Sequence, residues 1–109
     1  MPFDGSQSSN PMTTILQKVR GFIEEGWCQN HLRNGSQVCV RGAIFKALTG
    51  DPELGSKLVE AYKVEGVISK ANGITSVVAW NNGHTQSKAG ILNGLDRAIE
   101  YSRTLVVQG

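Results

Sequence analysis

The chain has 109 residues, of which 39% are hydrophobic and 18% are charged, and its formal net charge is +2. These values fit one globular domain with a modest core. They exclude a disulfide scaffold, since two cysteines are too few, and a strongly basic nucleic-acid-binding tail. No apolar run is long enough to span a membrane, and the first ten residues lack a secretory signal pattern. We therefore expect a cytoplasmic protein without a membrane partner.

The first helix is expected to follow a segment rich in Gly, Ser, Asn and Pro. Thr13 or Thr14 can cap this helix, and Gly26 suits a left-handed helix end. Its apolar stripe at helical spacing consists of Ile15, Leu16, Val19, Phe22 and Ile23.

A hairpin and a second helix follow. Asn34-Gly35 is a turn signal between segments that we expect to be extended, near 29–32 and 37–40. A short buried helix is predicted from about 39 to 48, and its Gly42-Ala43 pair would permit another helix to approach closely.

The third helical region is predicted to begin at Asp51-Pro52-Glu53, where Asp caps and Pro takes the first helical position. Gly66 is expected to break or kink this region, and Asn72-Gly73 to end it. Its apolar stripe is expected to contain Leu54, Leu58, Ala61 and Tyr62.

The last third of the chain combines an extended segment and a helix. Residues 74–79 are rich in β-branched side chains, which favours a strand or a buried extended segment. Residues 81–83 form a turn signal, and Thr85 can cap the final helix. The stripe of that helix is Ile91, Leu92, Leu95, Ala98 and Ile99.

Together these segments predict a mainly α fold. We expect a compact single domain of four to five helices, with a short two- or three-stranded element formed by the extended pieces. The boundaries are a disordered leader at 1–11, a helical domain at 12–104 and a tail at 105–109. The predicted core is Ile15, Leu16, Val19, Phe22, Ile23, Trp27, Cys39, Ala43, Ile44, Leu48, Leu58, Val78, Trp80, Leu92, Leu95 and Ile99.

Both tryptophans, both cysteines and both histidines lie in two distant stretches, residues 27–43 and 80–85. Their pattern, WCQ…CxxGA…WN[DN]…T…LxxAI, resembles a small uncharacterised domain family of actinobacteria, other bacteria and their phages. The resemblance spans roughly residues 15–102 and implies a fold and an origin but no activity. Asn82 stands where relatives usually have an acid, and Asn30 where they often have glycine. If the acid does chemistry in relatives, this chain has lost it.

We expect folding to bring the two stretches together into one binding surface. Trp27 and Trp80 could flank a small anionic or nucleotide-like ligand whose phosphate is received by basic side chains and helix-start amides. The alternative is that both rings simply close the core. The candidate ligand- or partner-binding residues are Trp27, Gln29, His31, Arg33, Arg41, Trp80, Asn81, Asn82, His84 and Thr85.

The preferred hypothesis is a non-enzymatic small binding protein without a cofactor. It would contact a host protein, as in host interaction or anti-defence, or sequester a small anionic ligand, and the same polar loops around aromatic rings suit a homo-oligomer. No Asp or Glu occurs at 26–50 or 66–95, which favours an anionic partner. Nucleic acid is disfavoured because the final helix lacks a dense basic face.

The alternative hypothesis is a zinc-stabilised or cysteine-dependent small enzyme. Cys28, His31, Cys39 and His84 could complete a Cys2His2 zinc site, or one cysteine beside a histidine could act as a nucleophile. The simpler interpretation is that the cysteines are core thiols and the histidines lie at the surface.

Overall fold

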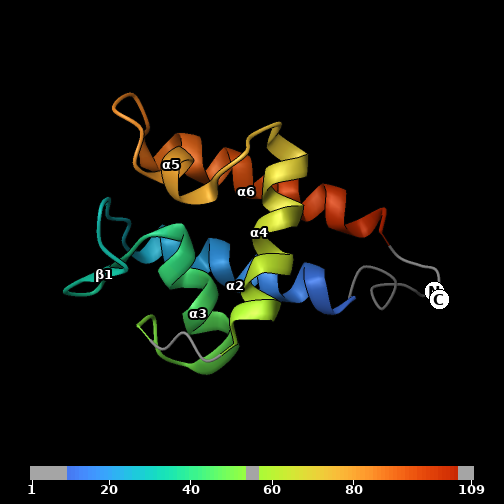
Figure 1. The fold of residues 1–109 in the computed structure, drawn as a ribbon, viewed down its shortest axis with the longest axis horizontal. Helices are drawn as coiled ribbons and strands as arrows, with labels where there is room; N and C mark the ends of the chain where they lie inside the picture. The colour runs from blue at the N-terminus through green and yellow to red at the C-terminus, as the bar shows by residue number, and fades with distance from the viewer. Residues whose placement is uncertain (1–9, 54–56, 106–109) are drawn as a thin grey trace.

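The computed structural model describes residues 10–53 and 57–105, which form five helices and a two-stranded antiparallel sheet (Figure 1). In chain order the elements are α2 (Pro11–Glu25), β1 (Arg33–Asn34), β2 (Gln37–Val38), α3 (Val40–Thr49), α4 (Leu58–Asn72), α5 (Val77–Asn81) and α6 (Lys88–Arg103). The predicted mainly α fold is confirmed. None of the described helices is long and apolar enough to cross a membrane.

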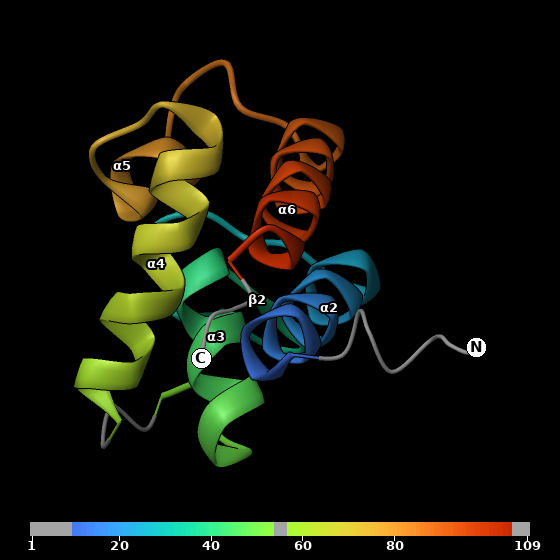
Figure 2. The ribbon, with the colours of Figure 1, turned by 90° about the vertical axis from the view of Figure 1, so that its right-hand side faces the viewer.

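Helix α2 packs against both α3 and α6, and α4 packs against α6 and α3 (Figures 1 and 2). The core lies between these four helices. Of the predicted core, the buried members are Leu16, Val19, Ile23, Cys39, Ala43, Ile44, Leu95 and Ile99. Several predicted members pack against the core while only partly buried, including Ile15, Phe22, Trp27, Leu48, Trp80 and Leu92.

Helix α2 begins earlier than predicted. Asn10 is its N-cap, and the Asn10 side chain accepts the Thr13 N–H at 2.8 Å. The prediction of a cap at Thr13 or Thr14 is therefore wrong, since Asn-Pro provides the cap and the first helical residue. Residues 10 and 11, which the predicted leader included, form the cap and the first helical position, and residues 1–9 lie outside the described part. Gly26 ends the helix in extended backbone with φ 175°, not in the left-handed conformation.

The predicted hairpin is present, although its first strand starts later than residue 29. Asn34 pairs with Gln37, and Gly35 adopts the left-handed conformation that the turn requires. Helix α3 follows nearly as predicted. A Cβ on Gly42 would lie 2.1 Å from the Leu32 carbonyl oxygen, so the close contact is with a loop and not with a helix.

The predicted start of the third helix at Asp51-Pro52 is wrong. Pro52 lies in a turn, Leu54 lies outside the described residues, and α4 begins at Leu58 and passes through Gly66 unbroken. Leu58 is 46% exposed and Tyr62 56% exposed, so neither belongs to the core. The buried side chains of α4 are Ala61, Val64, Val67 and Ile68.

The prediction of extended structure at 74–79 is also wrong. Ser76 caps α5, and its hydroxyl accepts the Ala79 N–H at 3.1 Å. Helix α6 begins at Lys88 because Ser87 is its N-cap, and not Thr85 as predicted. In both places a serine decides where the helix begins. Ser76 lies within the segment predicted to be extended, and Ser87 lies two residues after Thr85, the predicted cap.

Candidate functional site

The two tryptophan-containing stretches meet at the side chain of Asn81, the last residue of α5, which is 1% exposed. Its Oδ1 accepts hydrogen bonds from Trp27 Nε1 at 2.8 Å and from the Val40 N–H at 3.0 Å. Its Nδ2 donates to the Cys28 carbonyl at 3.1 Å and to Asn82 Oδ1 at 2.9 Å. The carboxamide thereby uses both donors and both acceptor positions.

The Asn81 carboxamide replaces one backbone hydrogen bond between two short, parallel extended segments. Trp27 pairs with Val38: the Val38 N–H donates to Gly26, and the Cys28 N–H donates to Val38. The next rung of a parallel ladder would join the Val40 N–H to the Cys28 carbonyl. These are the two backbone groups that Asn81 bridges, so its amide holds the strand ends together from a distant part of the chain.

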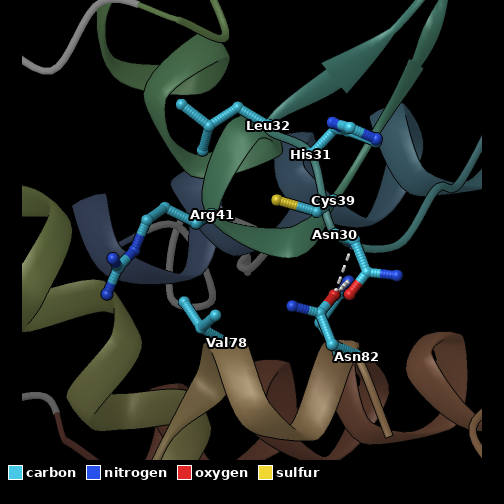
Figure 3. A pocket seen from close by; sticks show the side chains of 8 residues that line it. Asn30, His31, Leu32, Cys39, Arg41, Val78 and Asn82 are labelled. Carbon is cyan, nitrogen blue, oxygen red and sulfur yellow. Dashed lines mark hydrogen bonds between the residues drawn. The ribbon is translucent and has the colours of Figure 1, made fainter. Parts of the chain in front are cut away.

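A second set of hydrogen bonds strengthens this junction. The Gln29 amide donates to the carbonyl oxygens of Asn81 and Gly83, both at 3.0 Å. Asn82 Oδ1 accepts the Asn30 N–H at 2.8 Å, a contact drawn in Figure 3. Asn30 has φ 69°, a left-handed conformation that glycine and asparagine adopt most readily. An acid at position 82 would accept the same hydrogen bonds, so the departures at 30 and 82 preserve this junction.

A hollow of about 200 Å³ lies beside the junction, between the 30–32 loop, the start of α3 and α5 (Figure 3). It is lined by Asn30, His31, Leu32, Cys39, Arg41, Val78, Asn81 and Asn82. Leu32, Cys39 and Val78 give it an apolar wall, and His31 and the amides bring polar groups to its edge. No acidic residue is among the lining residues.

Arg41 lines the hollow, but its guanidinium extends past it toward α4 (Figure 3). Its Nε and Nη2 donate to the two carboxylate oxygens of Glu65 at 2.6 and 2.8 Å. These hydrogen bonds to Glu65 raise the pKa of Arg41 above its usual value. The Tyr62 ring centroid lies 5.9 Å from the Arg41 guanidinium carbon. The positive charge at the hollow is thus largely balanced within the protein.

The two indole rings, which were predicted to flank one ligand, do not line this hollow. Trp27 directs its indole N–H to Asn81, and neither tryptophan lines the hollow. Trp80 packs on α6, where a Cβ on Gly94 would lie 2.3 Å from its ring. The junction of the two stretches is therefore real, but its tryptophans serve packing.

Three further predicted residues lie away from the hollow. His84 and Thr85 are exposed in the segment between α5 and α6. Arg33, in β1, is exposed and pairs with Glu53 at 3.3 Å. Of the ten predicted site residues, the hollow gathers only His31, Arg41, Asn81 and Asn82.

Cys28 and Cys39 are both buried and are not joined in a disulfide. Cys39 is the N-cap of α3, and its Sγ accepts the Gly42 N–H at 3.3 Å. Burial raises the pKa of Cys39, and burial together with the nearby Cys39 raises the pKa of Cys28. An activated nucleophile needs the opposite shift. Among the described residues, no group of three or more His, Cys, Asp or Glu side chains could hold a metal ion, so the four-ligand zinc set is not assembled.

Sequence reasoning missed the residues that form the wall of the hollow. Leu32 belongs to the first tryptophan-containing stretch but is absent from the predicted site. Val78 is predicted as a core residue, and Cys39 as a core thiol, a metal ligand or a nucleophile, whereas all three line the hollow. Only Asn30 carried a local sequence signal for its conformation. An asparagine at a position where relatives often have glycine indicates left-handed backbone, which Asn30 adopts.

A family model described as "Family of unknown function (DUF6197)" matches residues 7–101 of the chain. This agrees with the resemblance to an uncharacterised domain family. No curated protein and no solved structure matches the chain.

Proposed function

We propose that this chain, which belongs to the DUF6197 family of unknown function, is a non-enzymatic binding protein whose hollow holds an apolar side chain of a partner protein. The observation that carries the proposal is the hollow itself, which lies where the two distant stretches meet. Such an arrangement favours recognition of something that enters the hollow over contact across a flat surface.

The size of the hollow favours a single side chain. Pockets for small molecules and cofactors usually have volumes of about 300–1,000 Å³, whereas this hollow has about 200 Å³. Residues that dominate protein interfaces commonly insert one large side chain into a well-packed pocket surrounded by polar contacts. Leu32, Cys39 and Val78 form a suitable apolar wall, and Asn30 and His31 are exposed at the edge.

The walls of the hollow are also held in fixed positions by hydrogen bonds within the protein itself. The four hydrogen bonds of Asn81 position α5 against the start of α3. A pocket already held in its bound shape loses little conformational freedom when it is filled. That the partner is a host protein, and that the chain acts in host interaction or anti-defence, follows from the resemblance to bacterial and phage domains alone.

A compact anion is the second candidate occupant. It is favoured because the lining contains Arg41 and no acid. It is opposed by the ion pair of Arg41 with Glu65, which already balances that charge. A nucleotide-like ligand would lack the stacking first expected of it, since no indole ring lines the hollow.

The proposal can be tested by NMR titration of the full chain with N-acetyl amides of leucine, methionine and phenylalanine, which mimic single side chains of a partner. Acetate and succinate test the anion. We expect the amides to shift the backbone signals of residues 30–32, 39–41 and 78. Val78→Phe, which fills the hollow, should abolish the shifts, and Val59→Phe on exposed α4 should not.

Shifts with the carboxylates alone would favour the second candidate. The absence of shifts at the hollow with any of these probes would overturn the proposal.

A further inference from the structure

We propose that Cys28 and Cys39 form a redox pair, which a peroxide oxidises to an intramolecular disulfide at the wall of the hollow. This inference concerns covalent chemistry of the chain itself and stands independently of what the hollow binds.

The backbone places the two cysteines opposite each other. Trp27 and Val38 form a parallel bridge, and the cysteines are the next residues on the two strands. The Cys28 N–H donates to the Val38 carbonyl at 3.1 Å, so the pairing extends to these positions. Paired strands lie about 4.7–4.9 Å apart, and a disulfide requires Cα atoms about 4.4–6.8 Å apart. The spacing of the pair therefore suits a disulfide.

Both cysteines also contact the same loop. Residues opposite each other on paired strands project to the same side. The Cys28 thiol donates to the His31 carbonyl at 3.5 Å, and the Cys39 N–H donates to the Leu32 carbonyl at 3.2 Å. The charge of Cys39 contributes to the raised pKa of Cys28, as expected for neighbouring thiols.

The hollow provides access for a small oxidant. Cys39 lines the hollow, and its sulfur is visible there in Figure 3, whereas Cys28 is not among the lining residues. Each residue is less than a tenth exposed. A peroxide entering the hollow therefore meets Cys39 first, and Cys28 acts as the resolving thiol. Among the described residues, no third metal-binding side chain stands beside the two cysteines, so the pair does not form part of a three-ligand metal site.

The chemistry balances with hydrogen peroxide as the oxidant. Cys39 reacts through its ionised form, which burial makes a minor fraction because it raises the pKa of this thiol. The Cys39 thiolate attacks one peroxide oxygen, the O–O bond breaks, and sulfenic acid and hydroxide form. The Cys28 thiolate then attacks the Cys39 sulfur, an S–S bond forms, and a second hydroxide leaves. The two thiol protons convert both hydroxides to water, so two electrons pass from the sulfurs to the peroxide.

The test uses the full chain, reduced and then treated with hydrogen peroxide. Remaining thiols are alkylated with N-ethylmaleimide in denaturant, and the product is analysed by intact mass and peptide mapping. We expect a monomer that has lost two hydrogens, takes up no maleimide, contains linked Cys28 and Cys39 peptides, and recovers both thiols with dithiothreitol.

Single variants assign the order of the steps. Cys28→Ala should accumulate a Cys39 sulfenic acid that dimedone traps, and Cys39→Ala should oxidise at least tenfold more slowly than the parent chain. Circular dichroism establishes that each variant is folded. Formation of Cys39 sulfinic acid beside a free Cys28, or only disulfide-linked dimers of the parent chain, would overturn the inference.

Discussion

At the scale of single residues, Asn81 shows how one polar side chain can organise distant parts of a small domain. Its amide joins Trp27, the Cys28 carbonyl, the Val40 N–H and Asn82. A buried amide is tolerated because each of its hydrogen-bonding positions has a partner. The same completeness makes the side chain difficult to replace.

We predict that Asn81→Asp lowers the free energy of unfolding by about 3 kcal/mol or more. The carboxylate would lose both donors and would face the Cys28 carbonyl and Asn82 Oδ1 at close range. Urea unfolding followed by circular dichroism measures the change. Asn93→Asp, at an exposed position of α6, is the matched control and should be nearly neutral. An Asn81→Asp variant as stable as the parent would contradict the role assigned to this amide.

The reactivity of Cys39 should also report its surroundings. Burial raises the pKa of Cys39, so less thiolate is present at a given pH than for an exposed cysteine. We predict that in Cys28→Ala the rate of Cys39 alkylation by iodoacetamide rises with pH through a midpoint above that of the same chain in urea. His31 and Arg41 share the hollow with this thiol and remain in place in the variant. A midpoint below the unfolded value would indicate an activated thiol.

At the scale of elements, helix starts are decided by caps more than by apolar stripes. In the predicted final stripe Ile91, Leu95, Ala98 and Ile99 are buried and Leu92 is half-buried. The helix, however, begins at the residue after Ser87. The Ser87 hydroxyl accepts the Gly90 N–H at 3.0 Å. Thr85, the predicted cap, lies outside the helix.

We predict that Ser87→Ala lowers the free energy of unfolding by about 1 kcal/mol because it removes the cap of α6. Thr85→Ala should change it by less than about 0.5 kcal/mol, since that side chain is exposed. Thermal and urea unfolding of the two variants measure the difference. Equal losses in both variants would show that Ser87 does not cap the helix.

Helix α4 shows why a stripe can be assigned to the wrong face. Leu58 and Tyr62 are four residues apart and read as one apolar row, yet both are exposed. Ala61 of the predicted stripe is buried, but the buried row continues from it through Val64 and Ile68, on another side of the helix from Leu58 and Tyr62. Because both faces of α4 mix apolar and polar residues, the sequence pattern does not specify which face is buried. Packing of α4 against α6 and α3 decides it.

At the scale of the whole molecule, glycines inside helices differ in what they pack against. Gly42 lies against the Leu32 carbonyl, whereas a Cβ on Gly66 in α4 would meet nothing within 4 Å. A side chain at Gly42 would therefore clash, whereas one at Gly66 has free space. Of the two glycines, only the first is required by the tertiary structure.

We predict that Gly42→Ala lowers the free energy of unfolding by about 2 kcal/mol, since a backbone carbonyl must move to admit the methyl group. Gly66→Ala should raise it by up to about 1 kcal/mol through better helix propensity and a less flexible unfolded chain. Chemical denaturation of both variants provides the comparison. A stabilising Gly42→Ala would contradict the contact with Leu32.

The sequence alone was sufficient for the helical class, the hairpin turn at Asn34-Gly35 and the apolar stripes of α2 and α6. These features depend on local periodicity, turn chemistry and unusual residue composition, which can be read from neighbours in the chain. The hollow, the bridging role of Asn81 and the opposed cysteines emerged only in the tertiary structure. Each depends on groups separated by many residues, whose hydrogen bonds and distances no local pattern specifies.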